Sequence, residues 1–387
     1  MIQAWRPILL GFTSAQLVAI AQRALGLSCL MWGFSAAAVQ AAVELRVAVE
    51  QQADTVVIGS STPAVVRDFN GGGVGQLPDG RAVTIQPDTR GLRLADWQGQ
   101  AFWVEPSNDG FVFVDDSWYR GRVLLLAADG KITAVNWVDL ETYLYSVLGS
   151  EMHANWPQEA LKAQAVAART YALYRRERSA HKIYDVGANT GYQVYKGLAS
   201  ESPATQTAVQ TTQGQVLTYG NQVIEAVFHS SSGGYTENAE DIWQRPAPYL
   251  RGVPDFDQTA PVFQWSETFT AEQFQKRVVG IGQLRQAIPE RVTPRGRVVS
   301  MRLEGTSGSR TISGREIRQA LNLRSTLFTI AIADNTIRID GRGFGHGIGM
   351  SQWGAFAMAQ QGYSYQQILS HYYQGTALSQ LRVANLP

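Results

Sequence analysis

The chain has almost no cysteine and no excess of charge of either sign. Only one of its 387 residues is cysteine, Cys29, and it lies close to the N-terminus. The rest of the chain therefore cannot form a disulfide, a thiol nucleophile or a cysteine-based metal site, which excludes the cysteine peptidases. Lys and Arg total 33 against 32 for Asp and Glu. No overall field would attract nucleic acid, so we expect no nucleic-acid partner.

Histidine is also scarce, and the motifs of several enzyme classes are missing. The five histidines show no HExxH or similar ligand spacing, so we expect no metal site and no cofactor. Three serines follow His229, but the nucleophile-elbow pattern G-x-S-x-G is absent. The stretch GRGFGHGIG does not satisfy G-x-G-x-x-G in any frame, which argues against a nucleotide site.

An uncharged N-terminal segment is the first feature that the chain does possess. Arg23 precedes a stretch without charge from Ala24 to Val43, and its second half is rich in alanine. Residues 1–41 are therefore predicted to be a signal peptide that is cleaved before Ala42. The alternative is an uncleaved membrane anchor, since about 20 apolar residues can span a bilayer. Either way we expect an exported protein of the periplasm, cell envelope or extracellular space.

The remaining sequence predicts an α+β protein in two parts. Residues 42–137 contain short runs of alternating apolar and polar residues separated by Gly, Asp, Asn and Pro, which indicates a β-rich N-terminal part. Residues 138–387 form a mixed α/β core, in which 181–245 are read as strands and loops. Residues 262–330 are predicted to be an inserted subdomain with two helices of its own, within FTAEQFQKRV and SGREIRQAL.

The first residue that could carry chemistry is Glu151. Asp139 is expected to cap a helix that ends at Gly149, and Asn155 to cap the following helix. Glu151 would then lie just past a helix C-terminus, where the helix dipole and burial both raise the pKa of a carboxyl group. A carboxylic acid that stays protonated can donate a proton to the leaving oxygen of a glycosidic bond. The alternative is an ordinary solvated glutamate of a loop.

Two further patterns indicate a ligand surface. Lys162 and Arg169 lie seven residues apart on the second helix, so they would share one stripe that could hold an anionic or acetamido group. The alternative is a solvated helix face. Glycines alternate from Gly341 to Gly349, which suits a flat backbone surface against which a ligand or a strand can lie. His346 would project from that surface, or would be a structural histidine of a turn.

Several long strings resemble the stage II sporulation protein D (SpoIID/LytB) family. DLETYLYSVLGSEM, followed by WPQEALKAQAVAARTYAL, is similar to its central signature. YQVYKG, FHSSSGGYTENAEDIW, PYLRGVPD and GRGFGHGIGMSQWGAFAMAQQGYSYQQILSHYY resemble its later blocks, in the same order. The resemblance runs from about Ala42 to Gly375 and is weakest over the insertion.

This resemblance implies binding to peptidoglycan glycan strands. Sporulation members of the family are lytic transglycosylases, whereas others are described as enhancers of a cell-wall amidase. The family's catalytic glutamate corresponds to Glu151. The resemblance implies that the residues contacting substrate are Lys162, Arg169, Ser232, Gly233, Gly234, His346 and Gln352.

The sequence departs from the family's pattern in two places. Some relatives bind zinc through a His/Cys cluster before the QVY block, but this chain has His181 and no cysteine there, so we expect no zinc. The residue after Glu151 and Met152 is often proline in the family and is His153 here. This change can alter the geometry of the loop.

Three functions follow from these observations. The first is cleavage of the bond between N-acetylmuramic acid and N-acetylglucosamine by Glu151, with a 1,6-anhydro product. The second is a non-enzymatic glycan-binding module that activates a cell-wall amidase. The third is a structural envelope protein that holds partners together. The intact motif around Glu151 favours the first.

Overall fold

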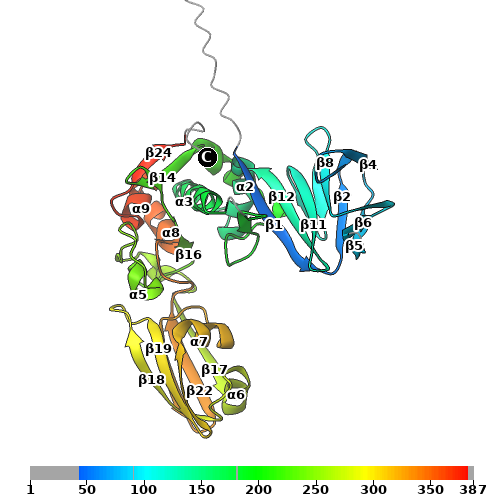
Figure 1. The fold of residues 1–387 in the computed structure, drawn as a ribbon. Coiled ribbons are helices and arrows are strands. Elements are labelled where there is room, and N and C mark those ends of the chain that lie inside the picture. The colour runs from blue at the N-terminus through cyan, green and yellow to red at the C-terminus, as the bar shows by residue number, and fades with distance from the viewer. Residues whose placement is uncertain (1–42, 90, 180–181, 382–387) are drawn as a thin grey trace, which may run out of the picture. The chain divides into compact units, whose positions relative to one another are not determined.

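The computed structural model describes residues 43–89, 91–179 and 182–381 (Figure 1). The predicted signal peptide or anchor (1–41) and His181 lie outside these residues. Within them, no helix is both long and apolar enough to cross a membrane.

The N-terminal part is built almost entirely of strands, as predicted. Its seven-stranded sheet has the order β13 (Val186–Gly187), β1 (Glu44–Ala53), β12 (Lys131–Asp139), β11 (Arg122–Ala128), β8 (Ala101–Pro106), β3 (Ala64–Asp68) and β4 (Gly73–Leu77). The second, six-stranded sheet has the order β10 (Ser117–Tyr119), β9 (Val112–Val114), β2 (Val56–Ser60), β5 (Val83–Asp88), β6 (Gly91–Leu94) and β7 (Trp97–Gly99). Because β13 comes from beyond residue 138 and pairs with β1, the first sheet continues into the second part of the chain.

Helix α2 (Leu140–Glu151) follows β12 directly. The Asp139 carboxylate caps it as predicted, accepting hydrogen bonds from the backbone N–H groups of Glu141 and Thr142. The predicted end at Gly149 was wrong, because the helix continues to Glu151. Gly149 instead permits close packing: a Cβ there would lie 1.8 Å from the carbonyl oxygen of Ser200 in the short helix η1 (Gly197–Ser200).

Helix α3 (Gln158–Glu177) is the central element of the core. Most of its residues are buried, and it packs against α2, α4 (Pro203–Thr211), α8 (Gln352–Gln360) and α9 (Tyr365–Tyr372). The predicted cap was wrong, since Pro157 occupies the capping position and no side chain caps the helix. Helix α4 was also missed in the predicted strand-and-loop region. Its signal was the capping box between Ser202 and Thr205.

Short strands connect the helices of this core. β14 (Gln215–Tyr219) lies between β15 (Gln222–Val223) and β24 (Ala377–Gln380). β16 (Phe228–His229) runs parallel to β23 (Met350–Ser351), which leads directly into α8. The short helices α5 (Ala239–Trp243) and η2 (Asp257–Thr259) follow β16.

The inserted region has its own sheets and its own hydrophobic cluster, which includes Phe274, Leu303 and Ile339. One sheet has the order β17 (Gln264–Thr270), β22 (Thr336–Arg342) and β21 (Phe328–Ala333), and the other β18 (Leu284–Val292), β19 (Val298–Gly305) and β20 (Gly308–Ser313). Its two predicted helices are confirmed as α6 (Ala271–Arg277) and α7 (Gly314–Leu321), each begun by a capping box. β22 lies in the middle of the first sheet, so this sheet extends past residue 330.

Candidate functional site

Glu151 is the last residue of α2, and its carboxylate is held by donors on both oxygens. The backbone N–H of Val194 donates to Oε1 at 2.9 Å, and the side-chain amide of Gln352 donates to Oε2 at 3.2 Å. The side chain is half-buried, whereas the adjacent Met152 is buried. The two bonds orient the plane of the carboxyl group while each oxygen keeps a further lone pair.

The environment of Glu151 favours its protonated form. Its pKa is raised from the ordinary value, and burial is the largest cause. The hydrogen bonds from Val194 and Gln352 act in the opposite direction, because they stabilise the charged carboxylate. No second carboxylate of the described residues contributes to the shift. Glu151 is therefore a single acid, without an acidic partner to share its proton.

Gln352 reaches Glu151 because β23 leads straight into α8. The pairing of β16 with β23 places Ser351 opposite His229, and the Ser351 side chain caps α8 by accepting the N–H of Gly354 at 3.1 Å. Gln352 is the first residue of the helix, and only 6% of it is exposed. The structure therefore brings together two of the predicted site residues, Glu151 and Gln352.

Aromatic side chains follow both of these residues in the chain. The Trp156 ring lies 4.8 Å from that of Trp353 and 4.9 Å from that of Phe356, between centroids. His153, where the family often has proline, is exposed and its ring lies 5.9 Å from that of Trp156. Trp353 and Phe356 are half-buried. In this cluster of His153, Trp156, Trp353 and Phe356, Trp156 is buried and the other three rings are at least partly exposed.

Lys162 and Arg169 do not form the predicted open cationic stripe. Arg169 is fully buried, and its guanidinium makes two hydrogen bonds to the Glu141 carboxylate, of 2.8 and 2.6 Å. Lys162 is partly exposed and pairs with Glu159 at 2.8 Å. Glu159 also accepts the backbone N–H of Tyr365 at the start of α9. Arg169 therefore joins α3 to α2, whereas Lys162 pairs within α3, and the buried Arg169 cannot contact a substrate from this position.

The Ser232–Gly233–Gly234 segment is occupied by contacts inside the protein. The Ser232 hydroxyl donates to Asp255 at 2.5 Å. The backbone N–H groups of Gly233 and Gly234 donate to the two oxygens of Asp257, at 2.8 and 3.0 Å. Ser232 is completely buried. The predicted substrate contacts are thus replaced by two buried aspartates that sequence reasoning missed.

The alternating glycines of residues 341–349 pack closely against other segments of the protein. Phe344 and Ser231 exchange backbone hydrogen bonds of 2.7 and 3.0 Å. Gly347 has φ +79°, and a Cβ there would lie 2.3 Å from the buried Arg297 guanidinium. A Cβ at Gly345 (φ +115°) would lie 2.6 Å from that of His229. These glycines are required by positive φ and by close packing.

His346 is a half-buried, neutral histidine of this loop. Its Nδ1 accepts the backbone N–H of Ile348 at 3.1 Å, and its ring lies 5.2 Å from that of His229 and 5.5 Å from that of Trp243. Burial and then the positive charge of Arg297 lower its pKa to about 3. Because Nδ1 is already hydrogen-bonded within the loop, the orientation of His346 is that of a structural histidine of a turn.

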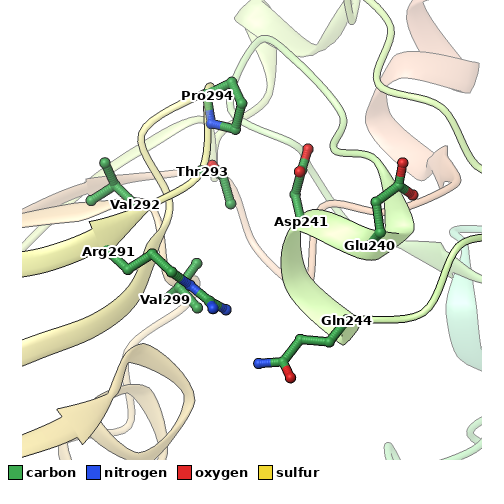
Figure 2. A pocket seen from close by; sticks show the side chains of 8 residues that line it. All are labelled: Glu240, Asp241, Gln244, Arg291, Val292, Thr293, Pro294 and Val299. Carbon is green, nitrogen blue, oxygen red and sulfur yellow. The ribbon is translucent and has the colours of Figure 1, made fainter.

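A separate pocket of about 280 Å³ lies between α5 and the 291–299 segment of the insertion (Figure 2). Its lining includes Glu240, Asp241 and Gln244 on one side and Arg291 and Thr293 on the other, and none of the predicted site residues. Within the described part of the chain, no group of three or more His, Cys, Asp or Glu side chains is placed to hold a metal ion.

Comparisons with known proteins identify the family of this chain. The family model described as "Stage II sporulation protein" matches residues 128–219, which include Glu151, and a "Domain of unknown function" matches 249–349, across the insertion. Stage II sporulation protein D of Bacillus subtilis is 39% identical over 262 residues, 63% of this chain and 75% of that protein. The Bacillus amyloliquefaciens protein of the same name is 38% identical over the same coverage.

The amidase enhancer of Bacillus subtilis is also similar, at 31% identity over 292 residues, which span 61% of this chain and 40% of that protein. The fold is of the mixed α+β class, and these relatives share at least 31% identity with the chain. The chain belongs to the stage II sporulation protein D family.

Proposed function

We propose that this chain cleaves peptidoglycan glycan strands as a lytic transglycosylase, with Glu151 as its catalytic acid and base. The observation that carries the proposal is the single carboxyl group with a raised pKa at the end of α2. An ordinary glycosidase uses two carboxyl groups, whereas a transglycosylase that closes an intramolecular ring needs one. No cofactor takes part.

The reaction proceeds in two steps at one carboxyl group. Protonated Glu151 donates its proton to the oxygen between N-acetylmuramic acid and N-acetylglucosamine, and the C1–O bond of the muramic residue breaks with oxocarbenium-like character at C1. The Glu151 carboxylate then takes the proton of the C6 hydroxyl of the same sugar. The O6–C1 bond forms, which yields the 1,6-anhydro end without consuming water and returns the proton to Glu151.

The residues around Glu151 have supporting roles in this scheme. Val194 and Gln352 hold the carboxyl group in one orientation through both steps. Their donated bonds stabilise the carboxylate formed after the first step, while burial raises the pKa and so favours the protonated acid before it. The half-buried rings of Trp353 and Phe356 are the surfaces on which we place sugar residues of the strand.

The similarity to an amidase enhancer supports a second candidate function. In that case the same surface binds glycan without cleaving it, and a cell-wall amidase is the partner. Both functions require an exported protein of the cell envelope, reached through the N-terminal segment as a cleaved signal or an anchor.

One experiment separates the two functions. Purified protein and its Glu151→Gln variant are incubated with glycan strands stripped of stem peptides, and the products are identified by mass spectrometry. We expect anhydro-muramyl products from the wild-type protein and none from the variant, with unchanged glycan binding by both. Equal product release by the variant rules out the role of Glu151. Binding without products from either protein favours the amidase-enhancer function.

A further inference from the structure

We propose that Asp255 is a positioning residue for the Glu151 site: it fixes the first turn of α8 and thereby holds Gln352 against the Glu151 carboxylate. The inference rests on the function proposed above, because it extends the set of residues that serve Glu151. Asp255 touches neither Glu151 nor Gln352 by any hydrogen bond found in the described part of the chain, so its effect passes through the helix.

The Asp255 carboxylate joins two segments that are distant from it in the chain. Its Oδ2 accepts the Ser232 hydroxyl at 2.5 Å, and its Oδ1 accepts the Tyr372 hydroxyl of α9 at 2.6 Å and the backbone N–H of Phe256 at 2.8 Å. The Ser351 side chain, at the start of α8, lowers the pKa of this carboxyl group. Asp255 is only 4% exposed, so these donors replace the water that a buried carboxylate loses.

The first turn of α8 lies directly on this carboxylate. A Cβ at Gly354 would lie 1.9 Å from Asp255 Oδ1 and 2.1 Å from the Tyr372 hydroxyl oxygen, so only glycine permits the approach. Ser351 caps the helix by accepting the N–H of Gly354, the same residue whose Cα side lies against Asp255. Gln352 lies between these two fixed residues. Its backbone therefore has little freedom, and its amide is aimed at Glu151.

The charged and titratable groups around Asp255 shift its pKa in both directions. Burial raises its pKa, and the negative charge of Asp257 adds to that rise, while the donors Ser232 and Tyr372 oppose it. The pKa of Tyr372 is raised well above its ordinary value, so its hydroxyl stays a donor. Asp257 binds Ser231, Gly233 and Gly234 and makes no hydrogen bond to α8 among the described residues.

A positioning role differs from a merely structural one in its effect on Glu151. Gln352 lowers the pKa of Glu151 by donating to its carboxylate. A variant that loosens the first turn of α8 weakens this bond and therefore raises the pKa of Glu151. Loss of a core contact that does not act through Gln352 leaves that pKa unchanged as long as the protein is folded.

The test follows the titration of Glu151 by NMR in the full chain labelled with carbon-13 at the glutamate carboxyl group. Glu151→Gln identifies the signal by its loss. We expect Gln352→Leu to raise the pKa of Glu151, and Asp255→Asn and Tyr372→Phe to shift it in the same direction. Tyr373→Phe is the matched control, because that buried hydroxyl donates to the carbonyl of Val227 and not to Asp255. It should leave the titration where it is.

A double-mutant cycle completes the test. If Asp255 acts through Gln352, then Asp255→Asn adds nothing to the shift already produced by Gln352→Leu. The proposal is overturned if folded Tyr372→Phe titrates like Tyr373→Phe, or if the shifts from Asp255→Asn and Gln352→Leu simply add. Should Asp255→Asn not fold, the two tyrosine variants decide the question. The titration needs no turnover, so its outcome is independent of the product assay that tests the proposed function.

Discussion

Gln352 donates a hydrogen bond of 3.2 Å to Glu151, although 201 positions separate the two residues in the chain. Glu151 ends α2, and Gln352 begins α8 after the glycine-rich loop. Their contact joins the central block of the family signature to its last block. It also sets the balance at Glu151 between burial, which favours the acid, and donated hydrogen bonds, which favour the carboxylate.

The contact predicts how cleavage depends on pH. The first step requires protonated Glu151, so the rate should fall as the pH rises through the raised pKa of this group. Gln352→Leu removes a donor to the carboxylate and should move this fall to higher pH. Initial rates of anhydro-muramyl release, measured across pH for both proteins, test the prediction. Curves that fall at the same pH would show that Gln352 does not tune Glu151.

Replacing Glu151 by glutamine should stabilise the fold at neutral pH. The pKa of Glu151 is raised above its ordinary value of 4.5 by burial. The folded state therefore favours the protonated form, and stability is lost as the pH rises from 4.5 through the folded pKa. Glutamine stays neutral and can still accept the N–H of Val194.

Urea unfolding at pH 7 and at pH 4 measures this effect. We expect the Glu151→Gln variant to be more stable than the wild-type protein at pH 7, and the difference to shrink at pH 4. A variant that is less stable at pH 7 would mean that the ionised carboxylate is favoured in the fold.

The two cations of α3 should differ strongly in their effect on stability. Arg169→Met leaves Glu141 without its fully buried partner, and breaking a buried ion pair costs about 3–5 kcal/mol. Lys162→Met breaks a partly exposed pair, and such pairs contribute about 0–1 kcal/mol. Urea unfolding measures the stability of both variants, and a glycan-binding assay on the folded proteins measures whether either variant has lost affinity. Equal stabilities, or a loss of binding confined to Arg169→Met, would restore a substrate role for Arg169.

Gly347→Ala should destabilise the protein more than Gly71→Ala, although both glycines have a positive φ. Its positive φ alone costs about 1–3 kcal/mol for a residue with a side chain. The new Cβ would also collide with the Arg297 guanidinium. Gly71 has φ +88° and no atom within 4 Å of the position that a Cβ would take, so Gly71→Ala isolates the backbone strain. Similar thermal shifts for the two variants would show that Arg297 moves aside without cost.

Local patterns predicted much of the secondary structure. Strand alternation located the β-rich part, Asp139 located the start of α2, and the two helices of the insertion, α6 and α7, were also predicted. The errors came where a residue with a local preference serves a tertiary contact. By residue type Gly149 suits the end of a helix, but in the structure it is where η1 packs against α2. Ser202 was overlooked as a cap because no strong apolar stripe follows it.

The candidate site was predicted in part. Glu151 and Gln352 lie together, whereas Arg169, Ser232 and His346 are engaged by partners within the protein. Residue type and spacing could not show which residues are engaged. An arginine buried against a carboxylate and an arginine exposed to solvent occupy the same kind of position in a helical sequence. Asp255 is the last residue of the family block PYLRGVPD, but that block by itself assigns it no role, and Asp257 lies outside the quoted blocks.

By itself the amino-acid sequence determined the family, the α+β class and the glutamate on which the proposed chemistry depends, because these follow from local patterns and from residue identity. Only the tertiary structure decided which polar side chains are free and which are used. Burial and hydrogen-bond partners depend on segments far apart in the chain, such as α8 against the end of α2. The pKa of Glu151 arises from that long-range packing.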